Sequence, residues 1–109
     1  MTPKNFFDAL KVLPDTKCQV KYTGEFKKNL KLAYRRLLNL ELMLNVVHKL
    51  AKHENLDVKF KPHVLTGNYA GIWDCHISPD WVLLWNWEDD NLTLVLVANE
   101  THTDLVLTS

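Results

Sequence analysis

The sequence predicts an α+β fold in which a helical hairpin packs on a small, mainly antiparallel sheet, with an extra helix at the N-terminus. Up to about residue 52, apolar residues recur at the three- and four-residue spacing of helices. From Ile72 onward, short apolar runs alternate with tight-turn sequences. With 109 residues, 47% of them hydrophobic, the chain is expected to form one domain with a modest core.

The first helix is predicted to be short. Thr2 is suited to cap it and Pro3 to occupy its first position. Pro14 ends the apolar spacing that follows, which is carried by Phe6, Phe7, Leu10 and Leu13. Cys18 to Tyr22 is a candidate strand.

Two further helices form the predicted hairpin. One begins near Gly24 after a capping Thr23, with an apolar face of Phe26, Leu30, Ala33, Leu37 and Leu38. The other runs from about Glu41 to Lys52, with inward-facing residues Leu40, Met43, Leu44, Val47 and Leu50. A polar connection, His53 to Pro62, follows.

Three antiparallel strands are predicted after this connection: Ile72 to Ile77, Trp81 to Glu88 and Leu92 to Ala98. Turns at Ser78-Pro79-Asp80 and Asp89-Asp90-Asn91 separate them. In the middle strand, Leu83, Trp85 and Trp87 alternate with Val82, Leu84 and Asn86. Because both sets are largely apolar, this strand is expected to be central and buried on two faces.

The net charge of zero conceals two halves of opposite sign. All 13 Lys and Arg residues lie between Lys4 and Lys61, against six Asp and Glu, a balance of +7. The rest of the chain has seven Asp and Glu and a balance of −7. The basic half suits a phosphate backbone or an acidic partner. Two complementary surfaces within one fold would explain the same division.

The two cysteines, Cys18 and Cys75, are too few for a disulfide framework, which favours a reducing cytoplasm. No apolar run approaches the length of a membrane span, and the first residues lack the core of a signal peptide. A cytoplasmic protein without a membrane partner is therefore expected.

Three histidines and the carboxylate of Asp80 are the candidate catalytic residues on or near the predicted strands. His76 and Asp80 flank a tight turn, so Asp80 could orient the imidazole; His63 lies in the loop before the hairpin, and His102 follows the last strand. Histidine can take or give a proton near neutral pH, as metal-independent RNA cleavage requires. Trp81, beside the turn, could stack on an unpaired base.

Simpler interpretations exist for each of these residues. A single histidine at a strand end is commonly a solvated polar residue, tryptophans in strands are commonly core, and His48 and His53 suit surface or capping positions. A zinc site formed by His63, Cys75, His76 and His102 is disfavoured because adjacent Cys75 and His76 point to opposite strand faces.

The motifs His63-Val64-Leu65, Asp74-Cys75-His76-Ile77-Ser78-Pro79-Asp80-Trp81 and His102 resemble those of the YafQ-like branch of the RelE/ParE toxins. The resemblance covers roughly Cys18 to Leu105. It suggests a toxin domain at residues 18–109 preceded by an N-terminal extension at residues 1–17.

The resemblance implies the toxin of a type II toxin–antitoxin system, a ribosome-dependent mRNA endoribonuclease that needs no cofactor or metal and is silenced by a cognate antitoxin. His102 would protonate the leaving oxygen, and His63 or His76 would be the base, with Asp80 positioning. Lys59, Lys61 and Trp81 would contact RNA.

The chain departs from the family pattern at three places. Trp73 replaces an arginine before Asp74, Ala98-Asn99-Glu100 replaces Arg-Thr-Gly, and Val106 replaces an aromatic residue. The missing guanidinium groups predict a reduced nuclease activity and motivate an alternative, a catalytically weak or inactive toxin-fold protein that acts through antitoxin binding and regulation. A ParE-like gyrase poison is a third hypothesis, which the histidine-rich motifs disfavour.

Overall fold

The computed structural model describes residues 1–99. Its helices and strands follow the order α1 (Pro3–Leu10), β1 (Val20–Tyr22), α2 (Gly24–Arg35), α3 (Leu40–Ala51), η1 (Val58–Phe60), β2 (His63–Val64), η2 (Gly67–Tyr69), β3 (Ile72–Ser78), β4 (Trp81–Glu88) and β5 (Asn91–Asn99), where η denotes a 3-10 turn. The sequence therefore predicted the third helix and the three long strands to within about one residue, whereas α1 and α2 end before the last apolar residues assigned to them, Leu13 and Leu38. Leu37, expected on the apolar face of α2, instead lies beyond the end of the helix at a positive φ of 71° and is 91% exposed.

Each α-helix begins at a side-chain cap. Thr2, Thr23 and Asn39 accept hydrogen bonds from backbone N–H groups three residues further on, at 3.2, 3.0 and 3.1 Å. These bonds satisfy donors that the first helical turn leaves unpaired. The caps at Thr2 and Thr23 are the two that the sequence predicted.

The five strands form one mixed sheet in the order β1-β5-β4-β3-β2. The pairs β2–β3, β3–β4 and β4–β5 are antiparallel, whereas β1 pairs with β5 in parallel. The register of β4 and β5 shifts between Leu84 and Trp85, which leaves Val95 without a direct partner. The hydroxyl of Thr23 donates to the carbonyl of this bulged residue at 2.6 Å, which ties the start of α2 to the sheet.

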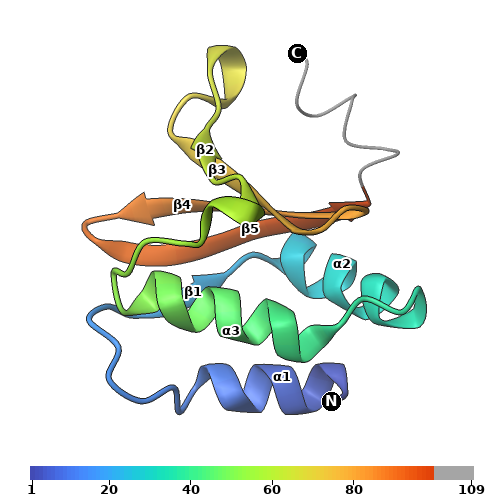
Figure 1. Ribbon diagram of the computed structural model, residues 1–109. Helices are drawn as coiled ribbons and strands as arrows, with labels where there is room; N and C mark the ends of the chain where they lie inside the picture. Colours follow the sequence, from blue (N-terminus) through green and yellow to red (C-terminus); the bar gives the residue numbers. More distant parts are fainter. Residues whose placement is uncertain (100–109) are drawn as a thin grey trace.

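The helices form two layers beside the sheet (Figure 1). α2 and α3 lie against one face of the sheet, and α1 packs on the outside of that helical pair. α1 is held there by three buried side chains, Phe6, Phe7 and Leu10. The expected fold class, a helical hairpin on a mainly antiparallel sheet with an extra N-terminal helix, is confirmed.

Strand β4 is buried on both faces, as its two apolar sets predicted. Leu83 and Trp85 belong to the large core beneath the helices, and Trp87 packs against that core. Val82 and Leu84 belong to a smaller cluster on the opposite face, with Leu65. The sheet thus has a helix-covered face and a second face on which polar groups can be placed.

The prediction that His63 lies in a loop was wrong. His63 and Val64 form the two-residue edge strand β2, which pairs with Asp74 and Trp73. No helix within residues 1–99 is long and apolar enough to span a membrane.

Cys75 offers a test of the buried strand β3. Burial, assisted by the negative charge of Asp74, raises the pKa of the Cys75 thiol to about 12. In a Cys18→Ser variant, whose only thiol is Cys75, we expect no reaction with a disulfide reagent at pH 8 until denaturant unfolds the chain. Rapid labelling of the native variant would contradict this burial.

Candidate functional site

His63 and Asp74 lie directly opposite each other on the antiparallel strands β2 and β3. Directly opposite residues project to the same face, so their side chains meet. The Nδ1 atom of His63 lies 2.8 Å from a carboxylate oxygen of Asp74 and 3.1 Å from the backbone carbonyl oxygen of Lys61. The imidazole is therefore fixed from two directions.

These contacts define the protonation of the His63 ring. Both neighbours of Nδ1 are oxygen atoms that can only accept, so we assign the proton to Nδ1, which donates to the carbonyl oxygen of Lys61 and lies in close contact with the Asp74 carboxylate. The Nε2 atom is then the nitrogen that can accept a proton. Because the His63 side chain is 55% exposed, a substrate can approach it.

Asp74 is the one charged residue among residues 1–99 that is fully buried. Removing a carboxylate from water is costly unless a partner compensates it, and His63 is such a partner. The sequence prediction assigned the orienting carboxylate to Asp80 instead. The spacing did contain a signal for Asp74, because it lies two residues before His76 and therefore shares its strand face.

A cavity of about 620 Å³ lies where the edge of β3 is no longer covered by β2. It is bordered by η1 and the β3–β4 turn, and its lining comprises Leu42, Lys59, Phe60, Lys61, His76, Ile77, Ser78 and Pro79. Two exposed ammonium groups and one imidazole, all predicted site residues, thus border one hollow. This arrangement suits an anion such as a phosphodiester.

His63 and His76 lie diagonally across the β2–β3 pair. His63 faces Asp74, and His76 follows two residues later on the same face of β3. Diagonal positions of this kind are roughly 7–8 Å apart in antiparallel sheets. That separation leaves room for a phosphate between the two imidazoles, with Lys59 and Lys61 beside His76.

The other predicted site residues do not join this group as expected. Asp80 is exposed in the β3–β4 turn, and Trp81 is only 8% exposed and belongs to the main core. The expectation that Trp81 stacks on a base is therefore corrected, because core packing covers its ring. His102 lies outside the described residues.

Trp73 packs toward the helices rather than toward His63 and His76. It alternates with Asp74 along β3, lies against the main core, and stacks on Trp85 with ring centroids 6.3 Å apart. A residue at position 73 therefore faces away from the candidate site. Replacing an arginine here removes no positive charge from the face that carries the histidines.

His48 and His53 have structural contacts, as their simpler interpretation predicted. The Nε2 atom of His48 lies 2.7 Å from the carbonyl oxygen of Pro14, and that of His53 lies 3.2 Å from the carbonyl oxygen of Asp90. Within residues 1–99, no group of three or more histidine, cysteine, aspartate or glutamate side chains is arranged to hold a metal ion.

The family model for the bacterial toxin of type II toxin–antitoxin systems, YafQ, matches residues 18–107. The chain belongs to this family. It is 30% identical over 71 residues to the mRNA interferase toxin YafQ of Escherichia coli K12, which is 64% of this chain and 77% of that protein.

Solved structures show the same relationship. A copper-bound mutant toxin from Helicobacter pylori superposes with a TM-score of 0.75 at 27% identity, covering 81% of this chain and 98% of that chain. The E. coli DinJ–YafQ complex gives a TM-score of 0.71 at 26% identity, covering 78% and 96%. The resemblance inferred from the histidine motifs is thereby confirmed.

The burial of Trp81 predicts a loss of stability on truncation. We expect Trp81→Ala to lower the free energy of unfolding by about 3–5 kcal/mol, the usual cost of removing a large core side chain. Asp80→Ala, at the neighbouring exposed position, should change it by about 0.5 kcal/mol or less. Denaturant unfolding measures both; equal, small effects would contradict core packing of Trp81.

Proposed function

We propose that this protein is a metal-independent endoribonuclease that cleaves mRNA on the ribosome and is silenced by an antitoxin. Family membership and the similarity to the mRNA interferase toxin YafQ of E. coli support this proposal. The observation that carries it is the His63–Asp74 pair beside a cavity bordered by His76, Lys59 and Lys61.

In the proposed reaction His63 is the general base. Its Nε2 takes the proton of the 2′-hydroxyl while Asp74 stabilises the resulting imidazolium through Nδ1. The 2′-oxygen then bonds to phosphorus and the bond to the 5′-oxygen breaks. The products are a 2′,3′-cyclic phosphate and a free 5′-hydroxyl, once an acid has protonated the leaving oxygen.

The other predicted residues complete this mechanism. His102 remains the proposed acid, and His76 is placed to contact the phosphate or to share the acid role. Lys59 and Lys61 supply the positive charge that the crowded phosphate needs, in place of the arginine that the family pattern has where this chain carries Ala98. Asp80, exposed at the turn, is proposed to act on substrate position rather than on His63.

Binding to the ribosome is proposed to use the outer face of α2. Lys27, Lys28, Lys31 and Arg35 are all exposed there, opposite the buried residues Phe26, Leu30 and Ala33. A row of cations on a rigid helix suits the phosphates of ribosomal RNA. The same face is proposed to be covered when a cognate antitoxin binds; the DinJ–YafQ complex shows that a relative has such a partner.

Replacing Asp74 should test the proposed base directly. In Asp74→Asn, the amide can donate to Nδ1, which would place the histidine proton on Nε2 and remove the base. We expect cleavage of mRNA on translating ribosomes to slow on the order of a hundredfold or more. Primer extension at new mRNA ends, followed over time, measures the rate.

Two comparisons sharpen this experiment. His63→Ala should lose about as much rate as Asp74→Asn, and the double variant should lose little more, because the two residues act as one unit. Asp80→Asn is the matched carboxylate control. If the cleavage rate falls more in Asp80→Asn than in Asp74→Asn, Asp80 and not Asp74 orients the histidine. Absence of new ends with the parent protein would favour the inactive, antitoxin-binding alternative.

The basic helix face predicts a salt-dependent affinity. Lys27→Gln combined with Lys31→Gln should weaken binding to ribosomes and reduce the slope of log affinity against log salt by about two, one for each lost phosphate contact. Lys4→Gln with Lys11→Gln, two exposed lysines near α1, is the control of equal charge change. An equal loss in both variants would assign the effect to net charge.

A further inference from the structure

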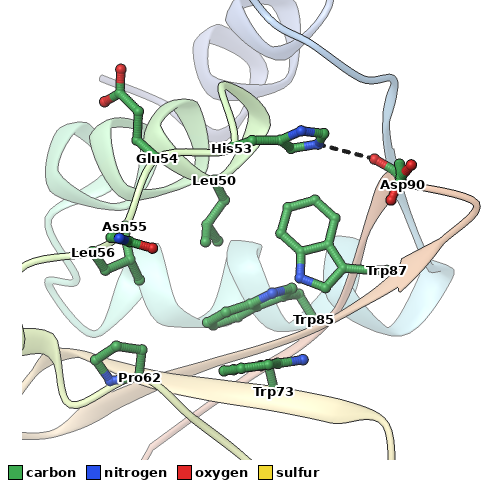
Figure 2. A pocket seen from close by; sticks show the side chains of 10 residues that line it. All are labelled: Leu50, His53, Glu54, Asn55, Leu56, Pro62, Trp73, Trp85, Trp87 and Asp90. Carbon is green, nitrogen blue, oxygen red and sulfur yellow. Dashed lines mark hydrogen bonds between the residues drawn. The ribbon is translucent and has the colours of Figure 1, made fainter.

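A second hollow lies on the helix-covered side of the sheet, behind His63 and Asp74. Its volume is about 640 Å³, and it lies between the end of α3, the segment that follows it, and strands β3 and β4. Its lining includes three indoles, one imidazole and two carboxylates (Figure 2): Trp73, Trp85, Trp87, His53, Glu54 and Asp90. We call it the tryptophan cleft.

The aromatic walls of the tryptophan cleft are held in place by defined contacts. Trp73 and Trp85 are stacked, with an interplanar angle of 17°. His53 meets the ring of Trp87 edge-on at 5.3 Å and contacts the backbone carbonyl of Asp90, which joins the end of α3 to the β4–β5 turn. The cleft is thus built by tertiary contacts and is more than a gap between side chains.

The charges around the tryptophan cleft are negative. Glu54 and Asp90 contribute carboxylates to its lining, and the two residues before Asp90, Glu88 at the end of β4 and Asp89 in the turn, are exposed. No lysine or arginine is among the described lining residues. Lys52 lies nearby and pairs with Glu54 at 3.5 Å, which leaves the Asp90 side of the rim the more strongly negative. The proposed nuclease makes no use of this acidic segment.

One buried polar group within the cleft lacks a partner. Trp85 is 2% exposed, and its indole N–H makes no hydrogen bond to any of the described residues. In Figure 2 the nitrogen lies on the edge of the Trp85 ring that points toward Trp87. Buried donors are normally paired, so an unpaired one at a cavity wall indicates a place for an acceptor.

We propose that the tryptophan cleft binds an arginine side chain presented by a partner protein. The guanidinium would stack on an indole face and approach the carboxylate of Asp90, while the backbone carbonyl of the arginine accepts the Trp85 N–H. Arginine is favoured because its planar cation both stacks on aromatic rings and pairs with carboxylates. The carboxylates disfavour an RNA nucleotide, because they would repel its phosphate.

This proposal is independent of the nuclease. The cleft and the His63–Asp74 pair lie on opposite faces of β3, and they share no residue. Failure of RNA cleavage would leave the cleft untouched, and failure of arginine binding would leave the proposed mechanism untouched.

The test uses a small probe and the full chain. N-acetyl-arginine methylamide is titrated into the protein, and the indole N–H signals of the tryptophans are followed by NMR. We expect saturable shifts at Trp85 and Trp87. The citrulline analogue, which has the same shape without the charge, should bind about fivefold to tenfold more weakly. Asp90→Asn should weaken arginine binding by a similar factor and leave citrulline binding unchanged.

Several outcomes would overturn the proposal. Equal affinity for arginine and citrulline would show that charge is not recognised, and an absence of saturable shifts would show that the cleft does not bind the probe. Trp87→Leu, at a half-buried position, should abolish the shift at Trp85 while circular dichroism shows a folded chain. Retained binding in this variant would place the arginine elsewhere on the surface.

Discussion

The buried carboxylate of Asp74 constrains the second face of the sheet. A carboxylate without contact with water needs a cation or several donors, and here His63 lies 2.8 Å away. Two residues of β2 are enough to bring His63 into register opposite Asp74. The short edge strand β2 therefore places a histidine next to the buried carboxylate. It also ends early enough to leave the rest of the β3 edge open at His76.

Strand β4 is buried on both faces of the sheet, and the two faces carry different features. On the helix-covered face, side chains from β3 and β4 form the main core and, at its border, the tryptophan cleft. On the other face, the small apolar cluster supports the strands that carry Asp74 and His76. Because strand residues alternate between faces, one β3 segment contributes Trp73 to the first surface and Asp74 to the second.

Helical spacing, caps and strand alternation predicted the architecture because those signals are local. The position of His63 relative to Asp74 was not predictable in the same way, since a two-residue strand has no periodicity to read and its register depends on tertiary pairing. The carboxylate nearest in sequence to the turn, Asp80, was therefore preferred over Asp74. Lys59, Lys61 and His76, which were predicted from the loop charges and the histidine motif, line one cavity, and their role in a site stays a prediction.

Trp73 and Trp81 show the limit of reasoning from motif position alone. Both lie beside motif residues, yet alternation and packing direct both rings into or against the main core. Trp81 is therefore part of the core packing at the start of β4. At position 73 the chain differs from the family pattern, but the side chain points toward the helices, so the difference does not alter the face that carries the histidines.

The division of charge in the sequence corresponds to two separate surfaces. The lysines at the His76 cavity and along α2 belong to the basic half, whereas Asp90 at the tryptophan cleft and its sequence neighbours Glu88 and Asp89 belong to the acidic half. Electrostatic interactions between exposed charges fade over about 8 Å at physiological ionic strength, whereas the molecule measures 36 × 32 × 27 Å. Each surface can therefore attract a partner of opposite charge, because salt screens the charges of the other surface.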